Sequence, residues 1–208
     1  MMMEDDRKTV YIDFDDVLCS TAESLLEILF EQYGKKISYD NLTHFDLSTC
    51  MNISNDKVGR ILDIAHSDEK ILQNDPVHNA SEALSMIAEM GYAIEIVTGR
   101  PRFTKTASEA WLSTYRIPYD HIYFVNKYAR QGDGYGDAET LSLEDIKKMH
   151  FSFAVEDSLD TAVFISNHLN IPVFLLDRPW NKKGAADANI KRCRGWGQIM
   201  ETLSKNPV

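Results

Sequence analysis

Cysteine is scarce in this sequence. Only three are present, Cys19, Cys50 and Cys193, and they lie far apart with no CxxC pair. An odd number without paired spacing argues against a disulfide framework and against a zinc ribbon. The six histidines show no HxH or HxxxH spacing, which gives no support to a zinc centre. We therefore expect reduced thiols in a cytoplasmic protein.

Long apolar runs and excess positive charge are also missing. No stretch reaches the roughly 18 apolar residues of a membrane span, and residues 1–8 have no apolar run of the kind found in signal peptides. Lys and Arg number 22 against 32 Asp and Glu, which gives a net charge of −10. Such a chain repels phosphate backbones, so we expect neither a nucleic-acid polymer nor a membrane as partner. A small anionic substrate is compatible if a metal ion supplies positive charge.

The chain is long enough for one domain with a small insertion. It has 208 residues, of which 44% are hydrophobic and 26% charged, and it shows neither repeats nor Pro/Gly-rich linkers. Five short, β-branched or aromatic-rich runs predict central strands of a parallel sheet. These runs are Thr9–Phe14, Tyr92–Val97, His121–Val125, Phe151–Val155 and Ile171–Leu176.

Helical patterns separate most of these runs. They cover Ala80–Met90, Thr104–Tyr115 and Leu159–Leu169. Strand and helix in alternation predict a doubly wound, mainly parallel α/β sheet. The sequence does not indicate an oligomeric state.

About 75 residues separate the first two strands, which is far more than one crossover needs. Ser20 and Glu23 predict a capping box that opens a helix ending at Gly34. Apolar residues follow a helical stripe there and again after Ser54; they are Leu25, Leu26, Leu29 and Tyr33, then Val58, Ile61, Leu62 and Ala65. We expect residues 19–76 to form a small helical cap on a core made of residues 1–18 and 77–208. Such lids exclude water and select substrates.

Polar residues follow four of the predicted strands. In chain order they are Asp13, Asp15 and Asp16; Thr98, Gly99 and Arg100; Asn126 and Lys127; and Glu156, Asp157 and Ser158. Because ligands bind beyond the carboxyl ends of the strands in such a sheet, these side chains should meet in one crevice.

The chemistry of the set is coherent. Asp13 and Asp157 offer the oxygen ligands that Mg²⁺ prefers, and Lys127 with Thr98 can bind a phosphoryl group. Asp13 can then attack phosphorus as a carboxylate nucleophile. Asp15 can act as acid and base at the same site only if the chain leaves strand geometry there.

Each piece alone has a simpler interpretation. A DxD pattern arises easily among 32 acids, Thr98-Gly99 can be an ordinary turn, and Lys127 can be surface charge. Glu156-Asp157-Ser158 can merely cap the next helix. Their joint occurrence at the ends of predicted strands favours the site.

These residues resemble the motifs of the haloacid dehalogenase-like (HAD) superfamily of phosphohydrolases. Asp13-Phe14-Asp15-Asp16-Val17-Leu18 resembles its first motif, Thr98 its second, Lys127 its third and Glu156-Asp157 its fourth. The resemblance implies strand order 5-4-1-2-3, a cap inserted after the first motif, and an aspartyl-phosphate on Asp13 with acid/base duty for Asp15. It also implies Mg²⁺ held by Asp13, the Asp15 carbonyl and Asp157, with Glu156 acting through water. The second aspartate favours phosphatase over dehalogenase chemistry.

Within the superfamily the sequence is similar to the type C 5'(3')-deoxyribonucleotidases and their bacterial relatives. The similarity rests on the cap size, on Thr98–Pro101 and on the tail from Leu176 to Asn181. Asp16 stands where many members carry Gly, and His78-Asn79 replaces the usual Pro-Gly. The implied activity is Mg²⁺-dependent hydrolysis of a small phosphorylated metabolite or nucleoside monophosphate. A catalytically idle binding or regulatory protein and a phosphotransferase to an alcohol remain alternatives.

A few further residues have two interpretations. Phe30, Tyr33 and Phe45 can pack in the cap or stack on a base, with packing favoured. Arg100 and Arg102 can touch the substrate phosphate or pair with nearby acids. Trp180 is expected in core or hinge packing. Residues 132–137 are rich in glycine and predict a surface loop.

Overall fold

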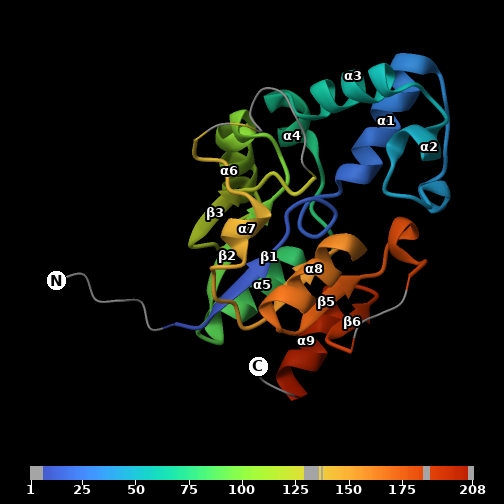
Figure 1. Ribbon diagram of the computed structural model, residues 1–208. Helices are drawn as coiled ribbons and strands as arrows, with labels where there is room; N and C mark the ends of the chain where they lie inside the picture. Colours follow the sequence, from blue (N-terminus) through green and yellow to red (C-terminus); the bar gives the residue numbers. More distant parts are fainter. Residues whose placement is uncertain (1–6, 129–135, 137, 185–187, 206–208) are drawn as a thin grey trace.

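The computed structural model describes residues 7–128, 136, 138–184 and 188–205, so the predicted loop at 132–137 lies outside the described residues except for Gly136. The described chain forms a six-stranded sheet in the order β3-β2-β1-β4-β5-β6, in which all neighbours are parallel (Figure 1). The strands are β1 (Thr9–Ile12), β2 (Ala93–Thr98), β3 (His121–Phe124), β4 (Ala154–Glu156), β5 (Val173–Leu176) and β6 (Ile190–Cys193). The predicted fold class and the implied order of the first five strands are confirmed.

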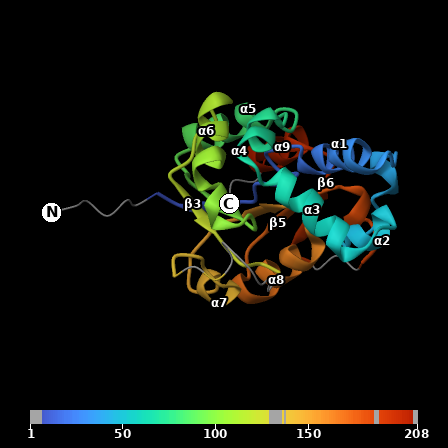
Figure 2. The ribbon, with the colours of Figure 1, turned by 90° about the horizontal axis from the view of Figure 1, so that it is seen from above.

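Helices cover both faces of the sheet (Figure 2). The helices are α1 (Thr21–Tyr33), α2 (Leu47–Met51), α3 (Asn55–Ala65), α4 (Asp68–Gln73), α5 (Ala80–Glu89), α6 (Lys105–Thr114), α7 (Leu143–Ile146), α8 (Leu159–Leu169) and α9 (Trp196–Lys205). Side chains of α5, α6 and α9 fill one apolar core, and those of α7 and α8 fill the other. This is the doubly wound arrangement that alternating strands and helices predict.

Alternation along β1 explains why both faces need cover. Val10 and Ile12 belong to the core under α5, α6 and α9, whereas Tyr11 belongs to the core under α7 and α8. Successive side chains of a strand point to opposite faces, so a strand that is apolar on both must be buried on both.

The two edges of the sheet differ from the prediction. β3 is an edge strand, and its first residue, His121, is exposed, so the expectation that all five runs are central strands is wrong for this one. β6 extends the sheet beyond β5 and was not predicted. Its sequence, Ile-Lys-Arg-Cys, carries two cations and is only four residues long, which gives little apolar signal.

The segment between β1 and α5 is helical and lies at the carboxyl ends of the strands (Figure 1). Helices α1 and α3 pack around an apolar cluster of their own; its buried members are Ala22, Leu25, Ile28, Leu29, Leu42, Met51, Ile61 and Ala65. The two ends of the segment meet where Cys19 forms a β-bridge with Pro76. The division into a cap of residues 19–76 and a core remains our proposal.

The start of α1 corrects one detail. Ser20 occupies the N-cap position but accepts no side-chain hydrogen bond, so the predicted capping box with Glu23 is wrong. Instead, the Ala22 N–H donates to Oδ1 of Asp16 at 3.0 Å. Asp16 has a left-handed backbone, with φ of 56°, and this turn places its carboxylate at the start of the helix, where it takes the capping role expected of Ser20.

None of the helices in the described ranges combines the length and the apolar character that a membrane span requires.

Candidate active site

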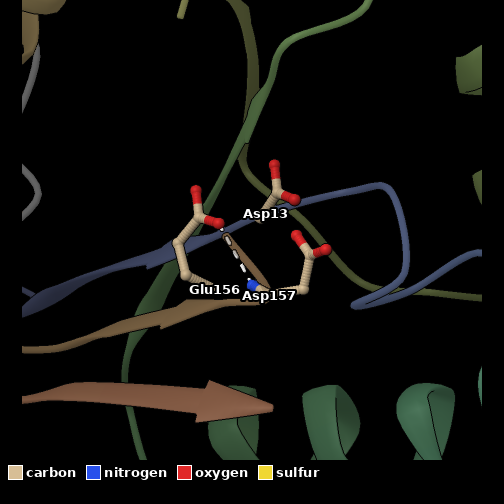
Figure 3. Close-up of side chains that lie close together, drawn as sticks. All are labelled: Asp13, Glu156 and Asp157. Carbon is tan, nitrogen blue, oxygen red and sulfur yellow. Dashed lines mark hydrogen bonds between the residues drawn. The ribbon is translucent and has the colours of Figure 1, made fainter. Parts of the chain in front are cut away.

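The order of the strands reverses between β1 and β4, and the predicted site residues meet at that point. β1 leads into Asp13 and Asp15, β2 ends in Thr98, β3 precedes Lys127, and β4 ends in Glu156. The carboxyl ends of neighbouring parallel strands share one edge, so chain segments far apart in sequence supply one crevice. Figure 3 shows Asp13, Glu156 and Asp157 gathered there.

Three carboxylates form the centre of the site. Asp13, Glu156 and Asp157 each place an oxygen within 4.8 Å of the others, and all three residues are buried. Burial raises the pKa of Asp13 well above its ordinary value, and the charges of Glu156 and Asp157 add to this. Burial, followed by the charge of Glu156, likewise raises the pKa of Asp157. Burial and the neighbouring carboxylates thus both disfavour the ionised forms of Asp13 and Asp157.

Lys127 is the cation at this cluster. Its Nζ donates to Oδ1 of Asp13 at 2.6 Å and to Oε1 of Glu156 at 2.8 Å, and its side chain is only 1% exposed. Burial opposes the charged form, but the carboxylates of Asp13 and Glu156 outweigh it and raise the pKa of Lys127. The ammonium group is therefore charged in the folded protein.

Both oxygens of Glu156 are engaged by the protein. Oε1 accepts from Lys127 and from the Tyr11 hydroxyl at 2.9 Å. Oε2 accepts from the backbone N–H groups of Asp157 and Ser158, both at 3.1 Å. Four hydrogen bonds fill the usual acceptor positions of a carboxylate, so this geometry suits a residue that holds Lys127 and the β4 loop.

The residues present fit a divalent cation. Asp13 and Asp157 supply oxygen ligands, which suit Mg²⁺, and the Lys127 ammonium group bonds Asp13 and Glu156, two of the three buried acids. An additional positive charge would relieve the repulsion from Glu156, which adds to burial in raising the pKa of Asp13 and Asp157. Asp157 is already oriented, because Trp180 Nε1 donates to its Oδ2 at 2.8 Å and Asn181 Nδ2 donates to its backbone oxygen at 2.7 Å.

The turn after β2 adds backbone and hydroxyl groups. Thr98 is fully buried, and its Oγ1 accepts from the Arg100 N–H at 3.1 Å. Gly99 lies so close to Tyr128 that a Cβ atom there would stand 2.9 Å from the ring. A side chain at position 99 would force Tyr128 to move, which explains why this turn carries glycine.

Asp15 meets the condition that its predicted role requires. β1 ends at Ile12, so Asp15 lies in the loop beyond the strand, where it forms a bridge with Cys19. Arg100 donates to its carboxylate from Nε and Nη2, and Thr21 donates from its hydroxyl. Burial alone would raise the pKa of Asp15, but Arg100 and Thr21 outweigh it and lower the pKa.

Arg100 and Arg102 both pair with acids, which is one of the two interpretations left open for them. Arg100 binds Asp15, and Arg102 contacts Glu139.

Three contributions to the site were not predicted: Arg178, Asn181 and the hydrogen bond from Trp180 to Asp157. Arg178 donates from Nε and Nη2 to the backbone oxygen of Asp16. The only signal was the Leu176–Asn181 tail, whose partners lie far away in sequence.

A cavity of about 140 Å³ opens from the acids toward the helical segment. The acids Asp13, Asp15 and Asp157 line it from the loops after β1 and β4. The helical segment contributes apolar lining residues, among them Leu25, Leu42, Leu47, Leu62 and Phe45, together with His44 and His66. The cavity lining thus combines metal-compatible acids with apolar side chains.

The three aromatic residues with two interpretations, Phe30, Tyr33 and Phe45, lie in different surroundings. Phe45 lines the cavity, is 44% exposed and lies with its ring 5.2 Å from that of Tyr128, so core packing is wrong for it. Phe30 is 56% exposed and is not in the core either. Tyr33 packs against the apolar cluster, as predicted. Trp180 packs against the same cluster while it bonds Asp157.

Known proteins resemble this chain over most of its length. A relative from Bacillus subtilis (strain 168), named "Putative nucleotidase YqfW", is 24% identical and covers 94% of this chain and 93% of its own. The solved structure of a HAD family hydrolase from Deinococcus radiodurans R1, with bound phosphate and sodium, matches with a TM-score of 0.58 at 15% identity, covering 96% of both chains.

A haloacid dehalogenase-like hydrolase from Streptococcus pneumoniae matches with a TM-score of 0.58 at 12% identity, covering 85% of this chain and 88% of its own. These structures show the shared fold. Residues 7–162 match the family model described as "5' nucleotidase, deoxy (Pyrimidine), cytosolic type C protein". The chain therefore belongs to this nucleotidase family within the HAD superfamily and is a phosphoric monoester hydrolase, as its motifs predict.

Proposed function

We propose that this protein is a Mg²⁺-dependent phosphomonoesterase that works through an aspartyl-phosphate on Asp13, with a nucleoside monophosphate or another small phosphorylated metabolite as substrate. The observation that supports this most strongly is the buried cluster of Asp13, Lys127, Glu156 and Asp157 at the switch point of the sheet. A nucleophile, a fixed cation and metal-compatible oxygens meet there in one place.

Asp13, Asp157 and the backbone carbonyl of Asp15 would hold the cation, and Glu156 would act through Lys127, because its own acceptor positions are taken by four hydrogen bonds. When bound, Mg²⁺ would supply positive charge that neutralises phosphate oxygens. Trp180 and Asn181 keep Asp157 in place for this purpose.

The first half-reaction transfers the phosphoryl group. A carboxylate oxygen of Asp13 forms a bond to phosphorus while the bond from phosphorus to the ester oxygen breaks. Asp15 gives that oxygen a proton, so that an alcohol leaves. Lys127, Thr98 and the backbone at Gly99 bind the phosphoryl oxygens throughout.

The second half-reaction releases phosphate. Asp15 removes a proton from water, the water oxygen bonds to phosphorus, and the bond to Asp13 breaks, which restores the free carboxylate. Arg100 and Thr21 favour the ionised form of Asp15, which suits this step. The first step needs the less populated protonated form, so esters with good leaving groups should depend least on Asp15.

The nucleotide preference rests on two observations. The family to which the chain belongs is described by its action on deoxynucleotides, and the helical segment lines the cavity with leucines and Phe45. An apolar pocket with a few polar groups suits a ligand whose phosphate is at one end and whose ring system is at the other.

The direct test is turnover. We expect p-nitrophenyl phosphate to be hydrolysed with Mg²⁺ and not with EDTA, and Asp13→Asn to abolish the reaction. A panel of nucleoside monophosphates and sugar phosphates, ranked by kcat/KM, then identifies the substrate class. Absence of turnover with any ester and any divalent metal would instead support an idle binding or regulatory protein. Phosphoryl transfer to an added alcohol in preference to water would support a phosphotransferase.

A further inference from the structure

Arg100 looks at first like a ligand for the substrate phosphate. It follows the Thr98-Gly99 turn directly and contributes to the cavity lining. Arginine is also the side chain best suited to bidentate recognition of phosphate. Its contacts in this structure indicate a different task.

The guanidinium group is already committed to the protein. Its Nε and Nη2 donate to Oδ1 of Asp15 at 3.0 and 2.7 Å, and its Nη1 donates to Oγ of Ser108 at 3.2 Å. Nη2 also contacts Sγ of Cys19 at 3.4 Å. The side chain is only 3% exposed. Hydrogen bonds from all three nitrogens therefore go to protein atoms.

One face of the guanidinium is covered as well. Its Cζ lies 4.0 Å from the ring centroid of Phe14, which is fully buried. A planar cation stacked on an aromatic ring is held in orientation as well as in position. A substrate phosphate would have to compete with Asp15 for the Nε and Nη2 donors.

The contacts on Asp15 are unequal. Oδ1 accepts from Arg100 Nε, Arg100 Nη2 and the Thr21 hydroxyl, at 2.5 Å for the last. From the described part of the chain, Oδ2 accepts one bond of 3.2 Å, from Arg100 Nε. Oδ1 is therefore saturated, and Oδ2 keeps the acceptor capacity. The side chain is 29% exposed, so solvent and ligands can reach it.

We infer that Arg100, together with Thr21, is a positioning residue that holds the Asp15 carboxylate so that Oδ2 carries out proton transfer, and that Arg100 does not bind the substrate phosphate. Thr21 is the first residue of α1, whereas Arg100 follows β2. The Asp15 carboxylate is therefore held both by the core and by the helical segment. The inference rests on the proposed function.

A double-mutant cycle tests this. Wild type, Arg100→Gln, Asp15→Asn and the double variant are compared with p-nitrophenyl phosphate and with the best alkyl ester of the panel. We expect Arg100→Gln to lower kcat for the alkyl ester by about 10- to 100-fold, as misplaced groups do. KM and the Kd of inorganic phosphate, measured by calorimetry, should stay within about twofold. In the Asp15→Asn background, Arg100→Gln should cause no further decrease in kcat.

Controls separate positioning from general damage. Arg102→Gln removes an arginine two residues away that contacts Glu139 and should leave kcat unchanged. Arg100→Lys keeps the positive charge but loses the two parallel donors of the guanidinium group, so its kcat should stay close to that of Arg100→Gln. If Arg100→Gln fails to fold by circular dichroism, Thr21→Val and its double variant with Asp15→Asn replace it, with Thr21→Ser expected to restore the rate.

The inference is overturned if the effects of Arg100→Gln and Asp15→Asn multiply, or if Arg100→Gln weakens phosphate binding by about tenfold. The same holds if Thr21→Val lowers kcat equally with and without Asp15. These failures differ from failure of the proposed function, in which the wild type itself shows no turnover or Asp13→Asn retains it.

Discussion

Nζ of Lys127 lies 2.6 Å from Oδ1 of Asp13, and this pair is buried between two further acids, Glu156 and Asp157. A lysine so placed orients the proposed nucleophile and leaves positive charge where phosphate oxygens would lie. Lys127→Met should therefore lower kcat with p-nitrophenyl phosphate by about 10²- to 10³-fold, as loss of one fixed donor to a transition state does. Lys147→Met, which removes a surface lysine paired with Glu144, is the control. A kcat within about threefold of wild type would remove Lys127 from the mechanism.

Trp180 should control metal affinity without binding the metal. Its Nε1 donates to Oδ2 of Asp157 at 2.8 Å, which leaves Oδ1 for a cation. Trp180→Phe removes the donor and retains an aromatic ring, so we expect Mg²⁺ affinity to fall by about tenfold or more. Tyr39→Phe, which keeps the ring stacked edge-on against Trp180, should change it little. Isothermal titration with Mg²⁺ measures both, and unchanged affinity in Trp180→Phe would contradict the role.

Asp16 should be more harmful to replace with alanine than with glycine. Both changes remove the hydrogen bond to the Ala22 N–H, which is worth about 1 kcal/mol at a helix start. Alanine must also adopt the positive φ of 56°, at a further cost of about 1 kcal/mol, whereas glycine adopts it freely. Urea denaturation should rank wild type above Asp16→Gly above Asp16→Ala. Equal stability of the two variants would contradict this account of the turn.

Glu95 should make stability depend on pH. Burial raises its pKa above the ordinary 4.5, and the partial opposition of His121 does not cancel this. The folded state therefore holds the proton more tightly than the unfolded chain, so the free energy of unfolding falls as pH rises above about 4.5 toward the folded pKa. Glu95→Gln has no carboxyl group at this position, so it does not show this decrease in the free energy of unfolding. Its stability relative to wild type, from urea denaturation with EDTA present, should be greater at pH 7 than at pH 4; the same difference at both values would refute the argument.

Much of the fold could be predicted because its signals are local. Apolar runs identified the first five strands, and the stripe from Leu25 to Tyr33 followed by Gly34 identified α1, which ends in a left-handed residue at that glycine. Parallel topology then requires the ends of the strands to meet, so Asp13, Lys127 and Asp157 could be expected together before any contact was known.

What could not be predicted depends on contacts between distant residues. Arg178 reaches the backbone of Asp16 across 162 positions, and no local pattern specifies such a partner. The capping box at Ser20 failed because the left-handed turn at Asp16 supplied a better acceptor. β6 was missed because an edge strand with Lys191 and Arg192 carries little apolar signal.

The central claim is that a phosphoryl group is bound covalently to Asp13. The measurement is rapid acid quench of Asp15→Asn during reaction with p-nitrophenyl phosphate and Mg²⁺, followed by peptide mass spectrometry. Loss of Asp15 should slow release of phosphate by about 10²- to 10⁴-fold, so we expect the peptide containing Asp13 to gain one phosphoryl group, and Asp13→Asn/Asp15→Asn to gain none. Two results would contradict the account, provided that the wild type hydrolyses the ester steadily. One is the absence of a phosphorylated peptide in Asp15→Asn, and the other is full activity of Asp13→Asn.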